Sequence, residues 1–158
     1  MIHIRNILVP LDFSEASRNA AHFAASLAQL HHARLYVLHV KAPFPVHGRI
    51  MGGSLEDVHK QHIHKEKVRL AQVIPTNLKE GITVEEIQVT GMPFDRVIVE
   101  MARKLGVDVI VMAWQAPKGL MRFLKKDLAQ QVLQNAPCSV FVVRSRRSKD
   151  VSSDVSHS

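Results

Sequence analysis

Cysteine is almost absent from this sequence, and long uncharged stretches are missing. The one cysteine, Cys138, cannot form a disulfide within the chain. Stretches without charged side chains, such as residues 19–33, stay short of the about 20 apolar residues that a membrane-spanning helix needs. The N-terminal apolar run reaches Asp12 without a small-residue cleavage site. We therefore expect a protein of the reducing cytoplasm, with neither a membrane span nor a secretion signal.

Extremes of composition are also missing. Hydrophobic residues make up 46% of the chain and charged residues 22%, which excludes disordered, collagen-like and disulfide-scaffold proteins. A chain of 158 residues is long enough for one domain that buries about two-thirds of its unfolded surface. We expect a single domain over residues 1–147 and a flexible polar tail over residues 148–158.

Acidic residues are scarce in one segment. Residues 101–147 hold nine Lys and Arg against two acidic residues, whereas residues 1–100 hold eleven against ten. The net charge of +7 therefore belongs to the second segment. A basic segment is typical of proteins that bind nucleic acid, membrane surfaces or phosphate groups, and the charge alone does not choose among them.

Five short apolar runs predict five buried strands. Their residues form continuous runs in place of strict alternation, which is typical of a parallel sheet covered on both faces. Stretches with helical spacing separate them, so we predict an open, doubly wound α/β sheet with helices on both faces. The predicted strands are residues 4–10, 35–40, 83–89, 107–112 and 140–143.

Four helices are predicted between these strands. The first follows Ser14, a good N-cap; the second spans about residues 55–78 with Pro75 as a kink or break; the third opens at Pro93; the fourth spans about residues 125–135. The second helix is long and polar, whereas the other three have an expected buried face. In the third helix this face is Phe94, Val97, Ile98, Met101 and Leu105. The faces of the other two are Ala20, Phe23, Ala24, Leu27 and His31 in the first helix, and Leu128, Val132 and Leu133 in the fourth.

The same segments resemble the universal stress protein family. The resemblance covers residues 4–144. It depends on four segments that are specific only when taken together, because each alone is a weak signal. These segments are Ile7 to Asp12, Gly91 with Pro93, residues 107–112 and residues 136–144. It implies the adenine nucleotide alpha hydrolase-like fold with strand order 3-2-1-4-5. It also implies a small cytoplasmic homodimer and, in many members, an ATP site at the carboxyl ends of strands 1, 2 and 4.

The family's glycine motif is altered in this sequence. That motif, G-x2-G-x9-G followed by Ser or Thr, comes directly after the fourth strand, and the matching positions here are Ala113, Ala116, Lys126 and Asp127. Glycines let the backbone approach phosphate groups, and the Asp127 carboxylate would repel them. The resemblance therefore implies that ATP binding is weakened or lost.

Other positions of the family's nucleotide site are retained by resemblance. Pro10, Asp12, Val40 and Met112 would line a cleft of adenosine size. Two roles stay open for Asp12, because a carboxylate after the first strand can accept hydrogen bonds from a ribose or can serve as a loop or cap carboxylate beside Ser14.

Trp114 and the basic loop after it have several readings. Trp114, placed in the loop after the fourth strand, could stack on an adenine, plug the cleft or contact a partner, and we favour the last two. The four positive charges in residues 118–126 could hold phosphate or RNA, but no aromatic ladder or glycine-rich turn accompanies them. We therefore expect a solvated face and no nucleic-acid partner.

Metal and thiol chemistry have weaker support. His59, His62 and His64 lack a suitably spaced acidic or cysteine partner, so we expect a polar helix surface without metal. Cys138 at the entrance of the last strand is expected to be a buried, inert thiol.

These observations lead to one interpretation and two alternatives. We expect a non-enzymatic stress-response protein, without a bound cofactor, that acts through an unknown protein partner. Its homodimer would form by pairing of the last strands along Val140 and Val142. The first alternative is a nucleotide-binding protein that still holds ATP or AMP at the ends of strands 1 and 4. The second, a hydrolase or transferase of the same architecture, lacks a visible catalytic set.

Overall fold

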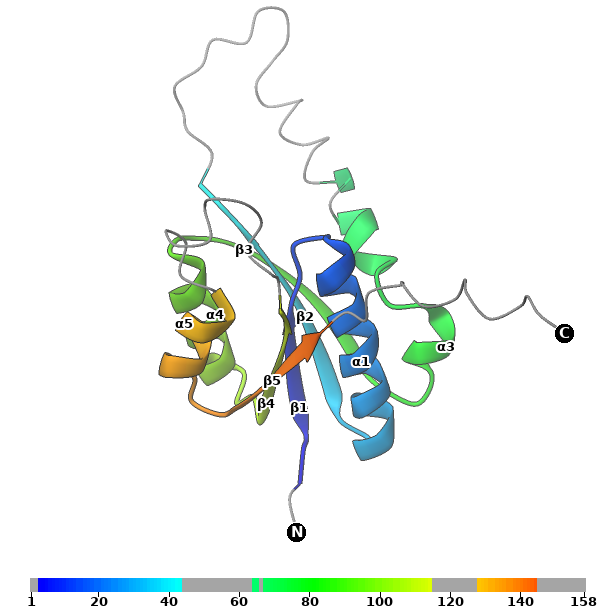
Figure 1. Cartoon of the computed structure of the whole chain (residues 1–158). Coiled ribbons are helices and arrows are strands. Elements are labelled where there is room, and N and C mark those ends of the chain that lie inside the picture. The colour runs from blue at the N-terminus through cyan, green and yellow to red at the C-terminus, as the bar shows by residue number, and fades with distance from the viewer. Residues whose placement is uncertain (1–2, 44–63, 66, 115–127, 145–158) are drawn as a thin grey trace, which may run out of the picture.

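A computed structural model gives the chain five strands that alternate with helices (Figure 1). It describes residues 3–43, 64–65, 67–114 and 128–144. Residues 64–65 and 67–71 are helical and are called the Arg69 helix below. The other elements are β1 (Asn6–Pro10), α1 (Glu15–His31), β2 (Arg34–Lys41), α3 (Thr76–Lys79), β3 (Val84–Thr90), α4 (Phe94–Lys104), β4 (Val109–Trp114), α5 (Leu128–Asn135) and β5 (Ser139–Arg144).

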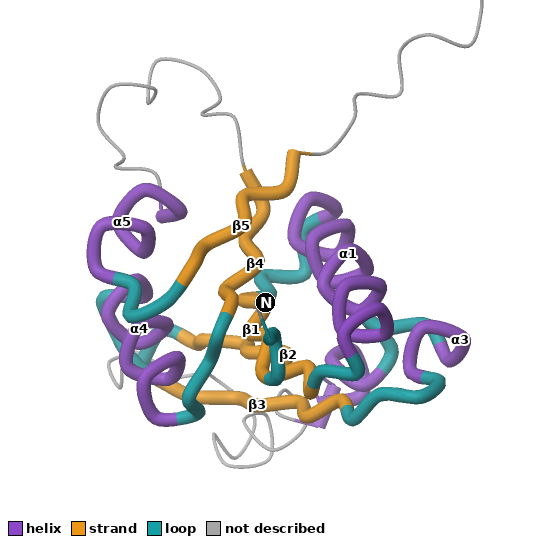
Figure 2. Tube along the Cα trace, turned by 90° about the horizontal axis from the view of Figure 1, so that it is seen from below, coloured by secondary structure: helices purple, strands orange, loops and turns teal. Residues whose placement is uncertain are grey.

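The strands form one parallel sheet in the order β3-β2-β1-β4-β5. This confirms the predicted doubly wound fold and strand order. Figure 2 shows α1 and α3 on one face of the sheet and α4 and α5 on the other. The sheet separates two hydrophobic cores, and successive side chains of β1 point into opposite ones. Ile7 and Val9 lie in the core under α1, while Leu8 lies in the core under α4 and α5. No helix in the described ranges is long and apolar enough to cross a membrane.

The α1 helix begins as predicted but buries a different face. The Ser14 Oγ accepts a hydrogen bond from the Ser17 backbone N–H at 3.1 Å, as an N-cap does. The expected face was wrong at Phe23 and His31, which are exposed. Small side chains take their place and let the helix lie close to the sheet. These are Ser17, Ala20, Ala21, Ala24, Ala25 and Ala28.

The α5 helix shows the same kind of difference. Val132 is buried as predicted, but Leu133 is 57% exposed and Leu128 is 37% exposed. The small Ala129 is buried in their place. In both helices the largest apolar side chains were expected inside, whereas close packing on the sheet selects the smaller ones.

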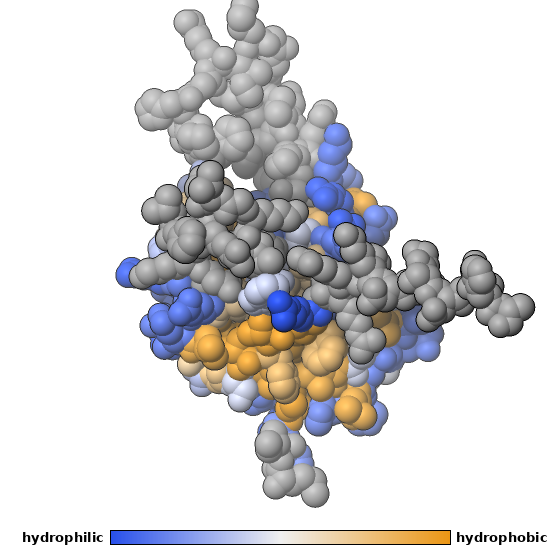
Figure 3. Space-filling model, viewed as in Figure 1, coloured by the Kyte–Doolittle hydropathy of each residue, from blue (hydrophilic) through white to orange (hydrophobic). Residues whose placement is uncertain are grey.

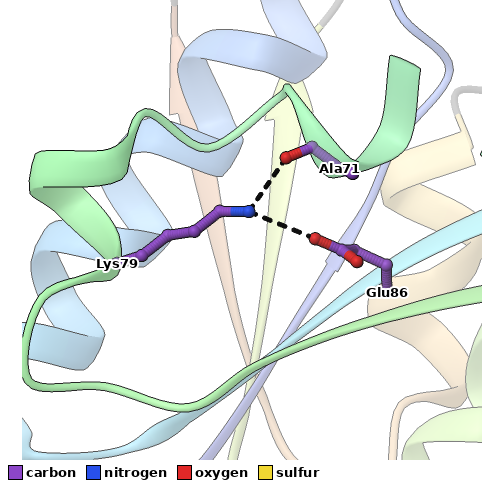
Figure 4. A network of polar contacts seen from close by, with 3 residues as sticks. All are labelled: Ala71, Lys79 and Glu86. Atoms are coloured by element: carbon purple, nitrogen blue, oxygen red, sulfur yellow. Dashed lines mark hydrogen bonds and ion pairs between the residues drawn. The ribbon is translucent and has the colours of Figure 1, made fainter. Parts of the chain in front are cut away.

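Pro75 breaks the predicted second helix, as expected. The Arg69 helix ends at Ala71 and Pro75 becomes the N-cap of α3. Figure 4 shows how the junction is held: Lys79 Nζ donates to the Ala71 carbonyl oxygen at 2.9 Å and pairs with Glu86 Oε1 at 3.3 Å. The end of the Arg69 helix is thereby tied to β3. The predicted start of this helix and the tail over residues 148–158 lie outside the described residues.

Candidate functional site

The sheet has a switch point between β1 and β4, where the order of the strands reverses. The two strands pair only at Ile7 with Val109 and at Leu8 with Ile110, although both continue beyond these pairs. Pro10 ends β1 and has no N–H to donate to a ladder. In open α/β sheets, ligands bind outside the carboxyl ends of the strands at such a point. The predicted site residues surround it.

Three of the predicted residues lie on one face of neighbouring strands. Met112 belongs to the core under α4 and α5, and Val40 packs against that core. Pro10 points to the same side, because Leu8, two residues before it, belongs to this core as well. Met112 is 4% exposed, so it acts mainly as a core residue. Pro10, Val40 and Met112 therefore lie on the same face of neighbouring strands, and Met112 is the most deeply buried of the three.

Asp12 is exposed directly after β1 and takes part in the cap of α1. Its Oδ1 accepts the Ser14 backbone N–H at 2.9 Å, which is an Asx turn. The Asp12 N–H donates to Ser17 Oγ at 3.4 Å. The cap role is thus present, and the same contacts fix the carboxylate at the amino end of α1, where the helix dipole favours negative charge.

An aromatic and basic stack lies next to Asp12. The Phe13 ring is 4.6 Å from the His39 ring, and the Arg69 guanidinium lies 4.4 Å from the Phe13 centroid. His39 Nδ1 donates to the Leu11 carbonyl oxygen at 2.7 Å. Phe13 has a φ of 62°, a left-handed conformation that costs about 1 to 3 kcal/mol outside glycine. These contacts hold the Asp12 loop in one conformation.

Sequence reasoning missed this stack. Phe13, His39 and Arg69 come from three separate segments, and periodicity does not predict contacts between segments. The one signal was His39, a polar residue within the apolar run of β2. A buried polar group needs a hydrogen-bond partner, which here is the Leu11 carbonyl group at the end of β1.

The β4 strand begins and ends two residues later than predicted and includes the start of the altered glycine motif. Ala113 and Trp114 are its last two residues, so Trp114 was wrongly placed in a loop. The Arg144 guanidinium lies 4.2 Å from the centroid of the Trp114 ring, a cation–π contact between the ends of β4 and β5. One side of the indole ring is therefore occupied from within the chain. This contact was not among the predicted roles of Trp114.

Several predicted residues lie outside the described ranges. These are Ala116, Lys126 and Asp127 of the altered motif, the basic loop over residues 118–126, and the pair His59 and His62. His64 is described and exposed. Within the described ranges, no group of three or more His, Cys, Asp or Glu side chains could hold a metal ion.

Cys138 is partly buried at the start of the last strand. Burial raises the pKa of its thiol, and the negative charge of Asp108 raises it further. The thiol therefore stays protonated at neutral pH, which disfavours a role as a nucleophile. The predicted burial is only partial, because Cys138 has intermediate exposure, and the inertness of the thiol stays a prediction.

A polar hollow lies at the opposite end of the sheet from the predicted site. Its volume is about 520 Å³, and its lining includes Arg5, Asn6, Arg34 and Thr83. These residues lie at or just before the amino ends of β1, β2 and β3. The hollow is therefore separate from Asp12 and the switch point.

The strand order and the two helical layers define the adenine nucleotide alpha hydrolase-like class of open α/β folds. The model of the Universal stress protein family matches residues 3–144, and the chain belongs to this family. The resemblance seen in the sequence is thereby confirmed.

Individual relatives agree with this assignment. Universal stress protein MJ0531 of Methanocaldococcus jannaschii is 31% identical over 140 residues, which cover 89% of this chain and 82% of that protein. The solved structure of hypothetical protein MJ0577 has a TM-score of 0.69 at 26% identity, covering 93% of this chain and 100% of that one. The universal stress protein from Archaeoglobus fulgidus in complex with dAMP has a TM-score of 0.58 at 25% identity, covering 90% and 98%.

Proposed function

We propose that this universal stress protein is a non-enzymatic, cytoplasmic homodimer that acts through contacts with another protein. In this proposal its ATP binding is weaker than that of relatives that keep the glycine motif. The observation that carries the proposal is the edge strand β5, where Phe141 and Val142 are 47% and 45% exposed. Apolar side chains on an open strand edge favour pairing with another strand.

The pairing of β5 supports a dimer contact along this edge. One side of the strand pairs with β4 from Val109 with Ser139 to Trp114 with Arg144. Within the described ranges, no strand pairs with the other side. Val140 packs against the core under α4 and α5, whereas Val142 is open. A second copy of β5 would cover Val142 and satisfy the outer backbone groups.

The proposed weakening of the nucleotide site is supported by the end of β4 and by the altered motif in the sequence. Ala113 lies inside β4, where the motif of the family begins with glycine. At the next position, Trp114 is a bulky side chain held by Arg144. Lys126 and Asp127 replace the last glycine and the hydroxyl residue of the motif. Ala113 and Lys126 add side chains where close backbone approach to phosphate is needed. Asp127 adds a negative charge that would repel phosphate.

Nucleotide content and affinity test this proposal. Freshly purified protein should release no stoichiometric adenine nucleotide on denaturation, and calorimetry should show ATP binding weaker than micromolar. Stoichiometric nucleotide, or a dissociation constant near 1 μM (about −8 kcal/mol), would contradict the weakened site. Light scattering tests the homodimer, and a monomer at high concentration would contradict it.

The second candidate is an adenine-nucleotide-binding protein, and one relative favours it. The Archaeoglobus fulgidus universal stress protein, at 25% identity, was solved with dAMP. In this chain Pro10, Val40 and Met112 share one face and Asp12 is fixed after β1. If calorimetry detects AMP binding, Asp12→Ala should abolish it under this candidate. Unchanged affinity in that variant would exclude the Asp12 site.

A further inference from the structure

The polar hollow at the amino ends of β1, β2 and β3 has no role in the proposed function. Its volume of about 520 Å³ lies within the range of small-molecule sites, about 300–1,000 Å³. Among the described residues that line it, none is acidic and three are basic: Arg5, His32 and Arg34. Apolar residues gather elsewhere, over β5, on the face shown in Figure 3. Basic side chains around a hollow of this size favour a small anionic ligand.

Hydrogen bonds of the backbone fix the walls of the hollow. Figure 2 is viewed from this end of the sheet. The Asp108 Oδ2 atom accepts the N–H groups of Arg5 and Asn6 at 2.8 and 2.9 Å, and these donors offset the charge of the carboxylate. The Arg34 N–H donates to the Arg5 carbonyl oxygen at 2.7 Å, and the Thr83 carbonyl oxygen accepts an N–H of β2 at 2.9 Å. Binding of a ligand therefore does not have to order the backbone of the hollow.

The basic side chains differ in the partners that they already have. Arg34 Nη1 pairs with Glu85 Oε1 at 3.1 Å, so its charge is largely offset. The Arg5 guanidinium and the His32 ring have no hydrogen-bond or ion-pair partner in the described part of the chain. A guanidinium has a planar fork of N–H donors that matches a carboxylate or phosphate group, and an imidazole has at least one N–H donor. Arg5 and His32 are therefore the side chains that an incoming anion would contact.

His32 stands where the backbone favours glycine. It ends α1 with a φ of 52°, in the left-handed region, and glycine is the usual residue at such a position. The His32 N–H caps the carbonyl oxygens of Ala28 and Gln29, and this contact needs only the backbone. The imidazole ring is thus not needed for the cap, and it lines the hollow.

Asn6 and Thr83 add uncharged polar groups to the same lining. Asn6 Nδ2 donates to the Gly106 carbonyl oxygen at 3.0 Å, which leaves Asn6 Oδ1 as an acceptor for a hydroxyl group. We propose that the hollow binds a small hydroxylated anion, with Arg5 and His32 on its phosphate or carboxylate group and Asn6 on a hydroxyl group. This proposal rests on neither the proposed dimer nor the nucleotide site.

The dipole of α1 offers a competing explanation for the basic side chains. The carboxyl end of a helix carries a partial negative charge that cations stabilise, and His32 lies at this end of α1. A purely structural role predicts that variants of Arg5 and His32 lose stability and keep their affinity for anions. A binding role predicts that they lose affinity, so both quantities have to be measured.

Calorimetry at low ionic strength with three hexose compounds tests the class of ligand. Glucose 6-phosphate carries a phosphate group, glucuronate carries a carboxylate, and glucose carries neither. We expect at least one of the two anions to bind with a dissociation constant below about 1 mM, and the anion that binds more tightly identifies the preferred group. Glucose should not bind. Absence of binding by both anions, or equal binding of glucose, would overturn the proposal.

A variant of Arg5 tests where the anion binds. Arg5→Gln removes the cation and should weaken the binding about tenfold, as expected for the loss of a hydrogen bond to a charged group. Arg96→Gln is the matched control, because Arg96 is exposed in the first turn of α4, at the opposite end of the sheet, and carries the same charge. The control should leave the affinity unchanged. Equal weakening in both variants would show that net charge alone attracts the anion and would overturn the site.

His32→Gly covers the case in which Arg5→Gln does not fold. Glycine adopts a left-handed φ readily, so urea unfolding should show a free energy of unfolding equal to or above that of the unchanged protein. The affinity for the same anion should nevertheless fall by about threefold to tenfold. Unchanged affinity in this variant would overturn the proposal, whatever its stability.

Discussion

At the scale of single residues, the site depends on contacts between segments that are far apart in the sequence. Asp12 is held by Ser14, two residues further along the chain, and this pairing could be predicted from the sequence. The conformation of Phe13 could not, because it depends on Arg69 and His39 from other elements. A positive φ in an aromatic residue has no sequence signal of its own. The contact between Asp12 and Ser14 was therefore predictable from the sequence. The contacts of Phe13 with His39 and Arg69 were not.

Gly91 is a residue whose missing side chain matters for packing. A Cβ at this position would lie 2.8 Å from Val97 Cγ2, which is too close for two carbon atoms. We predict that Gly91→Ala lowers the free energy of unfolding by about 1 to 3 kcal/mol, the usual cost of overpacking. Urea unfolding of the variant measures this difference.

A double-mutant cycle identifies the cause of that loss. Val97→Ala removes Cγ2 and has its own cost, but the double variant Gly91→Ala with Val97→Ala should be more stable than the sum of the two single changes predicts. Additive effects would show that the contact with Val97 is not the cause.

At the scale of elements, the strands followed the sequence more closely than the helix faces did. β1 and β2 are continuous runs rich in Val, Ile and Leu, and all five strands lie within a few residues of their predicted ranges. The helix faces of α1 and α5 differed because alanine, with little hydrophobic signal, packs closest to the sheet. The end of β4 was missed because Ala113 and Trp114 follow the apolar run that defined the strand.

The Lys79 network is an element-scale feature with a measurable role. Lys79 joins the end of the Arg69 helix to β3 through Ala71 and Glu86 (Figure 4). We predict that Lys79→Met speeds amide hydrogen exchange in residues 67–71 and lowers the free energy of unfolding by no more than about 1 kcal/mol, as for other exposed ion pairs. Hydrogen-exchange mass spectrometry measures the first effect.

Arg34→Met is the control for this prediction. Arg34 pairs with Glu85 at 3.1 Å, and this ion pair joins β2 to β3 without touching the Arg69 helix. The control should leave exchange in residues 67–71 unchanged. Equal exchange in both variants would show that Lys79 does not hold the helix.

At the scale of the whole molecule, charge and apolar surface are unevenly distributed. The excess of basic residues lies in residues 101–147, the segment that contains the altered glycine motif and β5. The exposed apolar side chains of the edge strand β5, Phe141 and Val142, lie on the same part of the chain. One segment therefore carries both the changes expected to weaken nucleotide binding and most of the surface proposed for the dimer.

Restoring the last two positions of the glycine motif, Lys126 and Asp127, tests whether changes there alone weaken nucleotide binding. Lys126→Gly with Asp127→Ser removes a long side chain and a negative charge, and it restores a hydroxyl group at the end of the motif. We predict that calorimetry shows ATP affinity at least about tenfold higher than in the unchanged protein, a gain of about 1.4 kcal/mol. Lys125→Gly is the matched control, because it removes the same positive charge at the preceding, variable position of the motif and should not increase affinity. An unchanged affinity in the double variant would show that the changes at Lys126 and Asp127 do not account for weakened binding.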